Sequence, residues 1–330
     1  MPALLVDDRW SGPHGIGRYA TEILRRLPPY EGLGARLSPT SPWSVLHLAE
    51  QCRRRRPTVF YSPAYMGPLF GETPTVLTLH DLIPLEAGSR TSTTSQLFFR
   101  HLLPTVARRA VCVLTVSECS RAALLDRLAL DPARVRLAPN GLSAEFSPSA
   151  PAFATDRPYF LMVAPSRTYK NRRAVLQAFA RSARLQTFDL RIVGNALSAT
   201  EQAGIPLAVL EHVHVHAGVA EVALPGLYRG AVALVHPAFL EGFGLPVLEA
   251  MGCGTPVACS DRASLPEVGG EAVLYFDPAD PEMIQTVLEQ LADSTELRRD
   301  LAARGTLRAT LFTWERSARA VCASITEAGL

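Results

Sequence analysis

Residues 232–260 read VALVHPAFLEGFGLPVLEAMGCGTPVACS and join two short apolar runs through a glycine-containing loop and a helical stretch. The runs 232–236 and 256–260 predict strands that are buried on both faces. A helix is expected over 246–251, with Pro246 in its first turn, where the missing N–H of proline is not needed. Strand, helix and strand in this order predict a parallel βαβ unit, with the loop at the carboxyl end of its first strand.

The same alternation of short apolar runs and longer helical patterns continues through the chain. It predicts an α/β protein in which helices cover parallel sheets. The other expected strands are residues 3–6, 59–62, 75–79, 111–116, 159–163, 190–193 and 213–217. The other expected helices are residues 17–27, 96–109, 120–128 and 173–184.

The length of 330 residues suggests two domains. The best linker is SPSAPAFATDRP, residues 147–158, which is poor in large apolar side chains. We therefore expect two doubly wound domains, residues 1–150 and 151–330, that face each other across a cleft. In such folds ligands bind in loops at the carboxyl ends of the strands.

The net charge of +2 argues against nucleic acid as a partner of the chain as a whole. Residues 1–150 carry 17 basic and 12 acidic groups, whereas 151–330 carry 16 and 19, which favours an anionic ligand or surface for the first half. The RRRR run at 53–56 is expected to end a solvated helix.

The chain has no apolar run that approaches a membrane span, and its six cysteines show no CxxC pair. The first residues, MPALLVDDRW, do not read as a signal peptide. We therefore expect a cytoplasmic protein with reduced thiols. Peripheral association with the inner face of the membrane is left open.

The loop after residues 232–236 combines features of a phosphate site and of a hydroxyl site. Gly242 and Gly244 allow close approach to a ligand, and the following helix presents unpaired N–H groups that favour phosphate. Glu241 and Glu249 can accept hydrogen bonds from hydroxyl groups. A sugar nucleotide has both groups, whereas glutamates near a helix N-terminus that serve only the helix are the plainer alternative.

The segment EGFGLPVLEA, residues 241–250, resembles the Glu-x7-Glu signature of the family-4 retaining glycosyltransferases, which have the GT-B fold of two Rossmann-like domains. The resemblance runs along nearly the whole chain and is closest to the bacterial mannosyltransferase-like branch. Its other blocks are GPHGIGRYATEIL (12–24), LHDLIPLE (79–86), TVSECSRAAL (115–124), LAPNGLSAEF (137–146), YKN (169–171) and LPEVGGEAVLYFDPAD (265–280).

The resemblance assigns donor-binding residues in the C-terminal domain. Glu249 would bind the ribose hydroxyls and Glu241 the transferred sugar, whereas Lys170, the only lysine of the chain, would hold the donor diphosphate. The backbone beside Glu241 also belongs to this set, at Gly242, Phe243, Gly244 and Leu245. The side chain of Asn171, next to Lys170, completes it. Ala164 and Pro165 stand where the family usually has glycine and arginine, so Arg167 is expected to supply the second cation.

The N-terminal domain would bind the acceptor. His80 and Asp81 would lie by the reacting carbon, and the loop with Gly15 and Gly17 would approach the donor phosphate or the acceptor. The last helix, at about 314–330, would cross back onto this domain, with Trp314 as a packing anchor. We therefore assign His80, Asp81, Glu241 and Lys170 as catalytic.

The implied reaction is the transfer of a hexose, with mannose from GDP-mannose as the first candidate, onto a glycan, a lipid-linked or a small-molecule acceptor in polysaccharide biosynthesis. The family retains the anomeric configuration without a metal, and we expect no cofactor.

Three alternatives remain open from the residues alone. A degenerate GT-B scaffold is suggested by Ala164 and Pro165. The glycines at 12, 15 and 17 could mark an NAD-dependent oxidoreductase, although the spacing is GxxGxG and no acidic residue ends the strand expected over 35–41. Histidines 212, 214 and 216 alternate as metal ligands could, yet they lie in an expected core strand.

Overall fold

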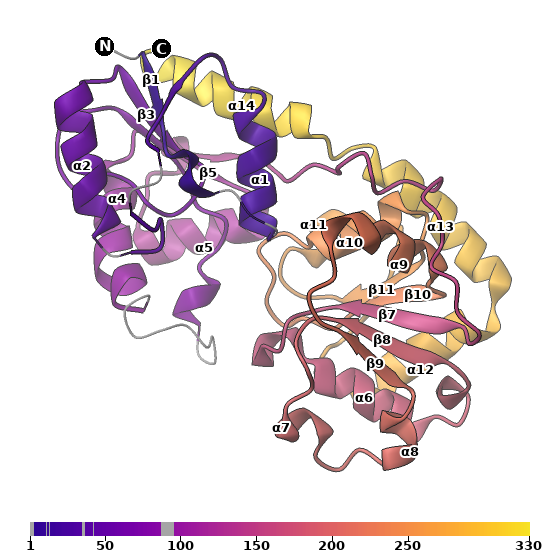
Figure 1. Ribbon diagram of the computed structural model, residues 1–330. Coiled ribbons are helices and arrows are strands. Elements are labelled where there is room, and N and C mark those ends of the chain that lie inside the picture. The colour runs from indigo at the N-terminus through magenta and orange to yellow at the C-terminus, as the bar shows by residue number, and fades with distance from the viewer. Residues whose placement is uncertain (1–2, 11, 13, 35–36, 42, 87–95) are drawn as a thin grey trace. The chain divides into compact units, whose positions relative to one another are not determined.

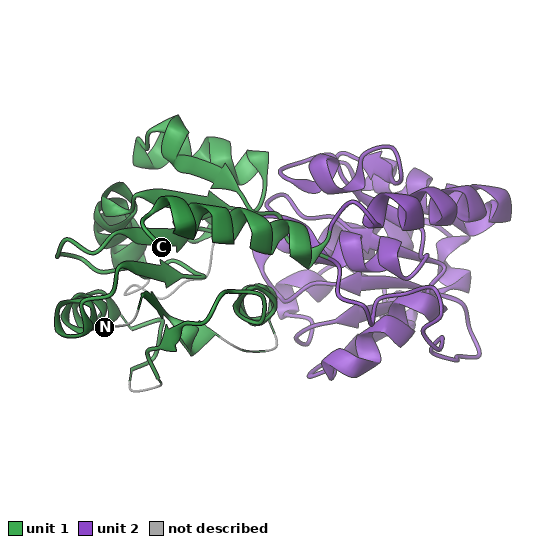
Figure 2. Cartoon of the chain, turned by 90° about the horizontal axis from the view of Figure 1, so that it is seen from above, with its two compact units in different colours: residues 1–141, 313–330 green, residues 142–312 purple. Residues whose placement is uncertain are grey.

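The computed structural model describes residues 3–10, 12, 14–34, 37–41, 43–86 and 96–330. The chain divides into unit 1, residues 1–141 and 313–330, and unit 2, residues 142–312 (Figure 2). The first division therefore falls after Gly141 rather than at the expected residue 150. The reason lies in Phe146, whose ring packs 6.0 Å from that of Tyr228 on unit 2, and the segment after it continues on this unit, where the N–H of Phe153 donates to the carbonyl of Gly226. The proline-rich segment 147–158 is thus attached to unit 2.

Among the described residues, unit 1 contains a parallel six-stranded sheet with the order β2-β1-β3-β4-β5-β6. Its strands are β1 (Leu4–Val6), β2 (Glu31–Gly32), β3 (Val59–Ser62), β4 (Thr75–Thr78), β5 (Cys112–Thr115) and β6 (Val135–Leu137). Its helices are α1 (Gly15–Leu24), α2 (Ser44–Arg55), α4 (Leu103–Arg109), α5 (Glu118–Leu128) and α14 (Trp314–Glu327), and a π-helical turn at Phe98–Leu102 precedes α4.

The C-terminal helix α14 lies beside α1 within unit 1 (Figure 1). Trp314 is buried, and its ring meets that of Tyr19 edge-on at 6.1 Å. Glu315 pairs with Arg26 at 2.8 Å at the start of the helix. The last eighteen residues therefore complete the core of the unit that the first 141 residues build.

Unit 2 contains a second parallel sheet, which has the order β12-β11-β10-β7-β8-β9 in the described residues. Helices α6 and α12 cover one face, and α9 and α10 lie on the other (Figure 1). The strands are β7 (Tyr159–Val163), β8 (Asp189–Val193), β9 (Val213–His216), β10 (Ala233–His236), β11 (Val257–Ser260) and β12 (Leu274–Phe276). The helices are α6 (Arg172–Arg181), α7 (Ala199–Gln202), α8 (Leu207–Leu210), α9 (Leu224–Gly230), α10 (Leu245–Gly252), α11 (Leu265–Gly269), α12 (Pro281–Asp293) and α13 (Thr295–Ala309).

Each strand expected from an apolar run is present, except the one expected over 35–41. Residues 35 and 36 lie outside the described part, and 37–41 form bends and turns rather than a strand. The strand that follows α1 is instead β2, only two residues long. The RRRR run ends α2 as expected, and its first two arginines pair with Glu50 on the exposed helix face.

In the part of the chain that the structure describes, no helix is both long and apolar enough to cross a membrane. The six cysteines are free thiols, four of them buried.

Candidate functional site

The loop between β10 and α10 depends on Gly244. Its φ of 105° lies in the left-handed region, and a Cβ there would stand 2.8 Å from Cδ2 of Leu265. A side chain at this position would therefore be strained and crowded. The glycine turns the chain from the strand into α10, with Leu245 as the first helical residue.

Side chains and backbone from two neighbouring loops fix the course of the β10–α10 loop. Ser260 donates to the carbonyl of Ala238 at 2.7 Å, and Ser264 donates to the carbonyl of Glu241 at 2.9 Å. The N–H of Phe239 donates to the carbonyl of Tyr169 at 2.8 Å. These contacts exist because β10 lies between β11 and β7, so that the carboxyl ends of the three parallel strands share one edge.

This edge brings together Lys170, Glu241 and His236. The Lys170 ammonium lies 2.6 Å from Oε2 of Glu241, and Nε2 of His236 donates to the same oxygen at 2.8 Å. Burial alone would raise the pKa of Glu241, but Lys170 and His236 outweigh it and lower the pKa to about 2. Glu241 is therefore an ionised acceptor at neutral pH.

Glu249 lies one turn into α10 and is only 4% exposed. Tyr228, on α9, donates its hydroxyl to Oε2 of Glu249 at 2.8 Å. The two glutamates of the signature thus have different settings. Glu241 is held by one ammonium and an imidazole, whereas Glu249 accepts from a phenol.

The loop that carries Lys170 ends in a left-handed residue, Asn171, with a φ of 53°. Its amide donates to the carbonyl of Pro278 at 2.7 Å, which ties the loop to the segment after β12. Arg167 is exposed at the start of the short 3-10 turn Thr168–Lys170. The ring of Phe243 packs against that of Phe312, with centroids 5.8 Å apart.

A buried arginine that sequence analysis did not identify braces the same loops. The side chain of Arg172 is 0% exposed, and it pairs with Glu201 through Nε and Nη2 at 2.6 and 2.8 Å. Its Nη1 donates to the carbonyls of Asn195 at 2.8 Å and of Ala164 at 3.4 Å. This network joins the loops after β7 and β8.

In unit 1, His80 and Asp81 follow β4. His80 is buried, its Nε2 donates to the carbonyl of Pro63 at 2.9 Å, and its ring meets that of Tyr19 edge-on at 4.8 Å. Burial lowers the pKa of His80 to about 4, so the imidazole is neutral near pH 7 and Nδ1 is left as an acceptor. Asp81 accepts a hydrogen bond from the N–H of Ile83 at 3.0 Å.

The glycine loop of unit 1 opens helix α1. Nδ1 of His14 accepts from the N–H of Gly17 at 3.0 Å and caps the helix, which begins at Gly15 rather than at the expected residue 17. A Cβ on Gly17 would stand 2.2 Å from the carbonyl oxygen of Gly12. Gly17 is therefore required for the close packing of the loop on itself.

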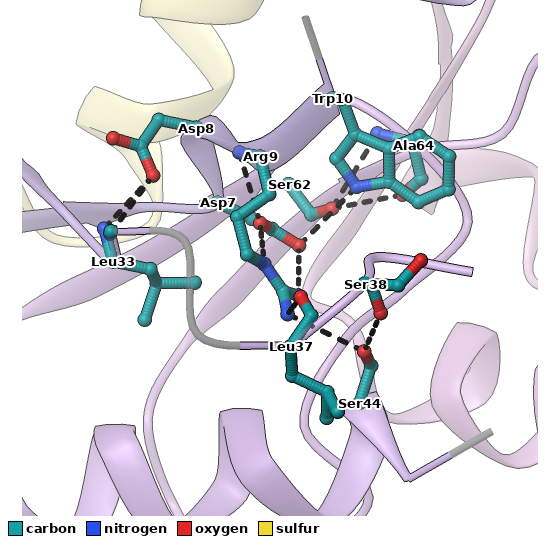
Figure 3. A network of polar contacts seen from close by, with 11 residues as sticks. Asp7, Asp8, Arg9, Trp10, Leu33, Leu37, Ser38, Ser44, Ser62 and Ala64 are labelled. Carbon is teal, nitrogen blue, oxygen red and sulfur yellow. Dashed lines mark hydrogen bonds and ion pairs between the residues drawn. The ribbon is translucent and has the colours of Figure 1, made fainter. Parts of the chain in front are cut away.

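The segment between β1 and this loop is fixed by a network around Asp7 (Figure 3). Nε and Nη2 of Arg9 donate to the buried Asp7 carboxylate at 2.6 and 2.8 Å, and Trp10 donates to it at 3.3 Å. Nη1 of Arg9 donates to the carbonyl of Leu37 at 2.9 Å. Residues Asp8–Trp10 form a 3-10 turn here, so the glycines do not directly follow the strand.

The alternating histidines lie at the edge strand β9. His212 and His214 approach the carboxylate of Asp189 at 3.6 and 3.2 Å, whereas His216 contacts Arg191 at 3.2 Å. Within the described residues, no group of three or more His, Cys, Asp or Glu side chains is arranged to hold a metal.

The structure therefore joins Lys170 to Glu241 and places Gly242, Gly244, Leu245, Glu249, Arg167 and Asn171 in loops or a helix of the same unit. His80, Asp81, Gly15 and Gly17 belong to unit 1. His236 and Tyr228 were missed by sequence analysis. The sequence feature that could have identified His236 is its position as a polar residue at the end of an apolar run, five residues before Glu241.

The two sheets and their order are those of the GT-B fold. HepE of Anabaena, solved with UDP, matches with a TM-score of 0.75 and 15% identity over 99% of this chain and 100% of that chain. Sucrose-phosphate synthase from Thermosynechococcus elongatus matches with a TM-score of 0.75 and 18% identity over 96% of each chain. At these identities the likeness shows the fold alone, and it confirms the expected fold class.

The chain belongs to the glycosyltransferase family described as "Glycosyl transferases group 1", whose model matches residues 143–308. A second model, "Glycosyltransferase Family 4", matches residues 5–146. The two matches together confirm the family that the sequence motifs indicated.

Several curated relatives are mannosyltransferases by name. O-antigen chain mannosyltransferase B of Escherichia coli is 49% identical over 92 residues, which are 28% of this chain and 24% of that protein. MMP alpha-(1->4)-mannosyltransferase of Mycolicibacterium hassiacum is 30% identical over 64% of this chain and 52% of its own length. O-antigen chain mannosyltransferase RfbU of Salmonella typhimurium is 28% identical over 79% of each. The matched segments of this chain thus span about a quarter of the first of these relatives and about half of the second.

Proposed function

We propose that this protein is a retaining glycosyltransferase that transfers a hexose, mannose in the first instance, from a nucleotide-diphosphate sugar to a glycan or lipid-linked acceptor. The observation that carries the proposal is the pairing of Lys170 with Glu241 beside the N-terminus of α10. This place offers positive charge for a diphosphate and a carboxylate for sugar hydroxyls. The mannosyltransferase relatives support mannose, and we propose GDP as its carrier.

Each donor-side residue has a distinct role in the proposed reaction. Lys170 and the first-turn N–H groups of α10 neutralise the charge that grows on the diphosphate as the sugar–phosphate bond breaks. Glu241 accepts from the sugar, and Glu249 accepts from the ribose. Arg167 supplies a second cation from the exposed start of the Lys170 turn. This assignment uses protein groups for charge neutralisation, without a metal or cofactor.

On the acceptor side, we propose that His80 contacts substrate as a neutral imidazole. Its Nε2–H is used by Pro63, so Nδ1 accepts a hydrogen bond from a hydroxyl. A pKa of about 4 makes it a weak base, which fits a front-face displacement in which the leaving phosphate takes the acceptor proton.

The two other classes of function have weaker support. A scaffold without activity would not need an ionised Glu241 that is paired with the only lysine of the chain. A nicotinamide site would need glycines that directly follow β1, whereas the turn at Asp8–Trp10 and the Asp7–Arg9 pair intervene.

A donor panel tests the proposed function. Release of nucleotide from GDP-mannose and from other GDP, UDP and ADP sugars is measured with mannosylated acceptors, and calorimetry measures the binding of GDP, UDP, ADP and NADH. The proposal expects one nucleotide diphosphate to bind and its sugar to be transferred with retention. Binding of none of them would remove the proposal, and binding without transfer would favour the scaffold.

We further propose that unit 1 meets the inner face of the membrane. Trp43 and Phe70 are 68% and 50% exposed, and a hydrogen bond from Leu69 to Val45 brings their segments together. Arg109 donates to the carbonyl of Gly71, which places a cation next to the segment that carries Phe70. Exposed aromatic rings with a neighbouring cation suit an anionic lipid surface. Sedimentation with phosphatidylglycerol vesicles should recover the wild type but not a Trp43→Ser, Phe70→Ser variant, and equal recovery would refute attachment.

A further inference from the structure

His236 is the last residue of β10 and lies fully buried next to Glu241. Its Nε2 and the ammonium of Lys170 approach the same carboxylate oxygen, Oε2, at 2.8 and 2.6 Å. In the part of the chain that the structure describes, the other oxygen of Glu241 accepts no hydrogen bond. The carboxylate is therefore held from one side, with Oε1 left for a ligand hydroxyl.

The imidazole of His236 lowers the stability of the fold. An ionised carboxylate can only accept, so Nε2 carries the proton and Nδ1 carries a lone pair. Among the described residues Nδ1 has no hydrogen-bond partner, although it is buried. An unpaired buried polar atom lowers stability, and an apolar side chain at the end of a core strand would avoid this cost. The contact with Glu241 is thus the one evident gain from histidine at this position.

Lys170 has two anionic partners in the proposed reaction. Without donor its ammonium pairs with Glu241, and with donor it is attracted to the diphosphate. When the ammonium shifts, Glu241 loses its closest cation although its side chain is only 14% exposed, which would be costly without another donor. His236 stays in reach because burial on β10 fixes its ring.

We infer that His236 is a positioning residue that keeps Glu241 oriented toward the transferred sugar while Lys170 passes from Glu241 to the donor diphosphate. The inference rests on the proposed function. Burial, the largest influence, lowers the pKa of His236, so the ring is neutral near pH 7 and does not compete with Lys170 for the anion. A second fixed cation in this place would hold the carboxylate but would also repel the ammonium.

The test uses three substitutions that differ in the placement of one donor. In His236→Gln the side-chain amide can reach the position of Nε2, whereas in His236→Asn it is too short, and His236→Phe keeps the ring without a donor. Calorimetry measures the affinity for GDP, which lacks the sugar, and for GDP-mannose. A hydrogen bond to a charged group is worth about tenfold or more in an equilibrium. We expect the Asn and Phe variants to bind GDP at least about tenfold more weakly and the Gln variant to recover most of the affinity.

A double-mutant cycle separates positioning from a structural role. In a Glu241→Gln background the carboxylate is absent, so His236→Phe should change GDP affinity by less than about twofold. An equal loss of GDP affinity in both backgrounds overturns the inference. Unchanged GDP affinity in both the Asn and the Phe variants overturns it as well. Circular dichroism melts identify which of the Asn and Phe variants folds, and that variant is used for the comparison.

The outcome for the wild type distinguishes the two proposals. If the wild type binds no nucleoside diphosphate, the proposed function fails and the inference fails with it. If the wild type binds one and the His236 variants bind it equally well, the function stands and only the positioning role is refuted.

Discussion

Glu201→Gln should destabilise unit 2 because it removes the charge that neutralises a fully buried arginine. Both oxygens of Glu201 accept from Arg172, whose other N–H groups reach backbone carbonyls at Ala164, Asn195 and Ala196. Glutamine keeps the shape of the side chain, but it replaces one acceptor oxygen by a donor. The guanidinium would then face an amide N–H without compensation of its charge.

The size of the effect follows from the pKa of Glu201. Burial alone would raise this pKa, but hydrogen bonds from Arg172 and Ser198 lower it to about 2, and the side chain is 14% exposed. A fall from 4.5 to about 2 corresponds to about 3 kcal/mol of stabilisation. Because the folded-state pKa is depressed, this contribution is complete above about pH 4.5 and is lost as the pH falls toward 2.

Urea unfolding followed by far-ultraviolet circular dichroism measures the loss, since the three tryptophans, Trp10, Trp43 and Trp314, all lie in unit 1. Glu50→Gln is the matched control, because Glu50 also pairs with two arginines but on an exposed helix face, where no resolvable loss is expected. A loss below about 1 kcal/mol for Glu201→Gln at pH 7 would refute the reasoning. A loss that stays constant between pH 7 and pH 3 would refute it equally.

Three further predictions concern the site. Lys170→Arg should lower turnover at least about tenfold in a nucleotide-release assay, because a guanidinium fork would occupy both oxygens of Glu241. The melting temperature should change little. Near-normal turnover would contradict this prediction. Gly244→Ala should cost about 1–3 kcal/mol in urea unfolding, because φ is 105° and the new Cβ meets Leu265, and wild-type stability would show that the loop relaxes. His80 should titrate with a midpoint of about pH 4 when followed by NMR. Its contribution to stability should fall as the pH drops from 6.5 toward 4, because in this range only the unfolded chain binds the proton. A titration midpoint near 6.5 would exclude this.

Most of the sheets could be predicted because buried parallel strands appear as continuous apolar runs. The strands that escaped prediction, β2, β6 and β12, are only two or three residues long, and the first two carry the charged side chains Glu31 and Arg136. Their pairing with longer neighbours, rather than their own composition, makes them strands. The division between the units falls nine residues before the expected one for a similar reason, because the contact of Phe146 with Tyr228 outweighs the loop-like composition that follows it.

The sequence by itself determined the family, the two α/β units and the choice of Lys170, Glu241 and Glu249 as candidates, since glycine spacing, helix starts and strand patterns are local properties. Only the tertiary structure decided which groups meet. Lys170 and Glu241 lie 71 residues apart and pair because β7 and β10 are adjacent in the sheet. The adjacency of β7 and β8 likewise buries Arg172 between the loops that follow these two strands. Such contacts depend on strand order and on burial, which no single stretch of sequence encodes.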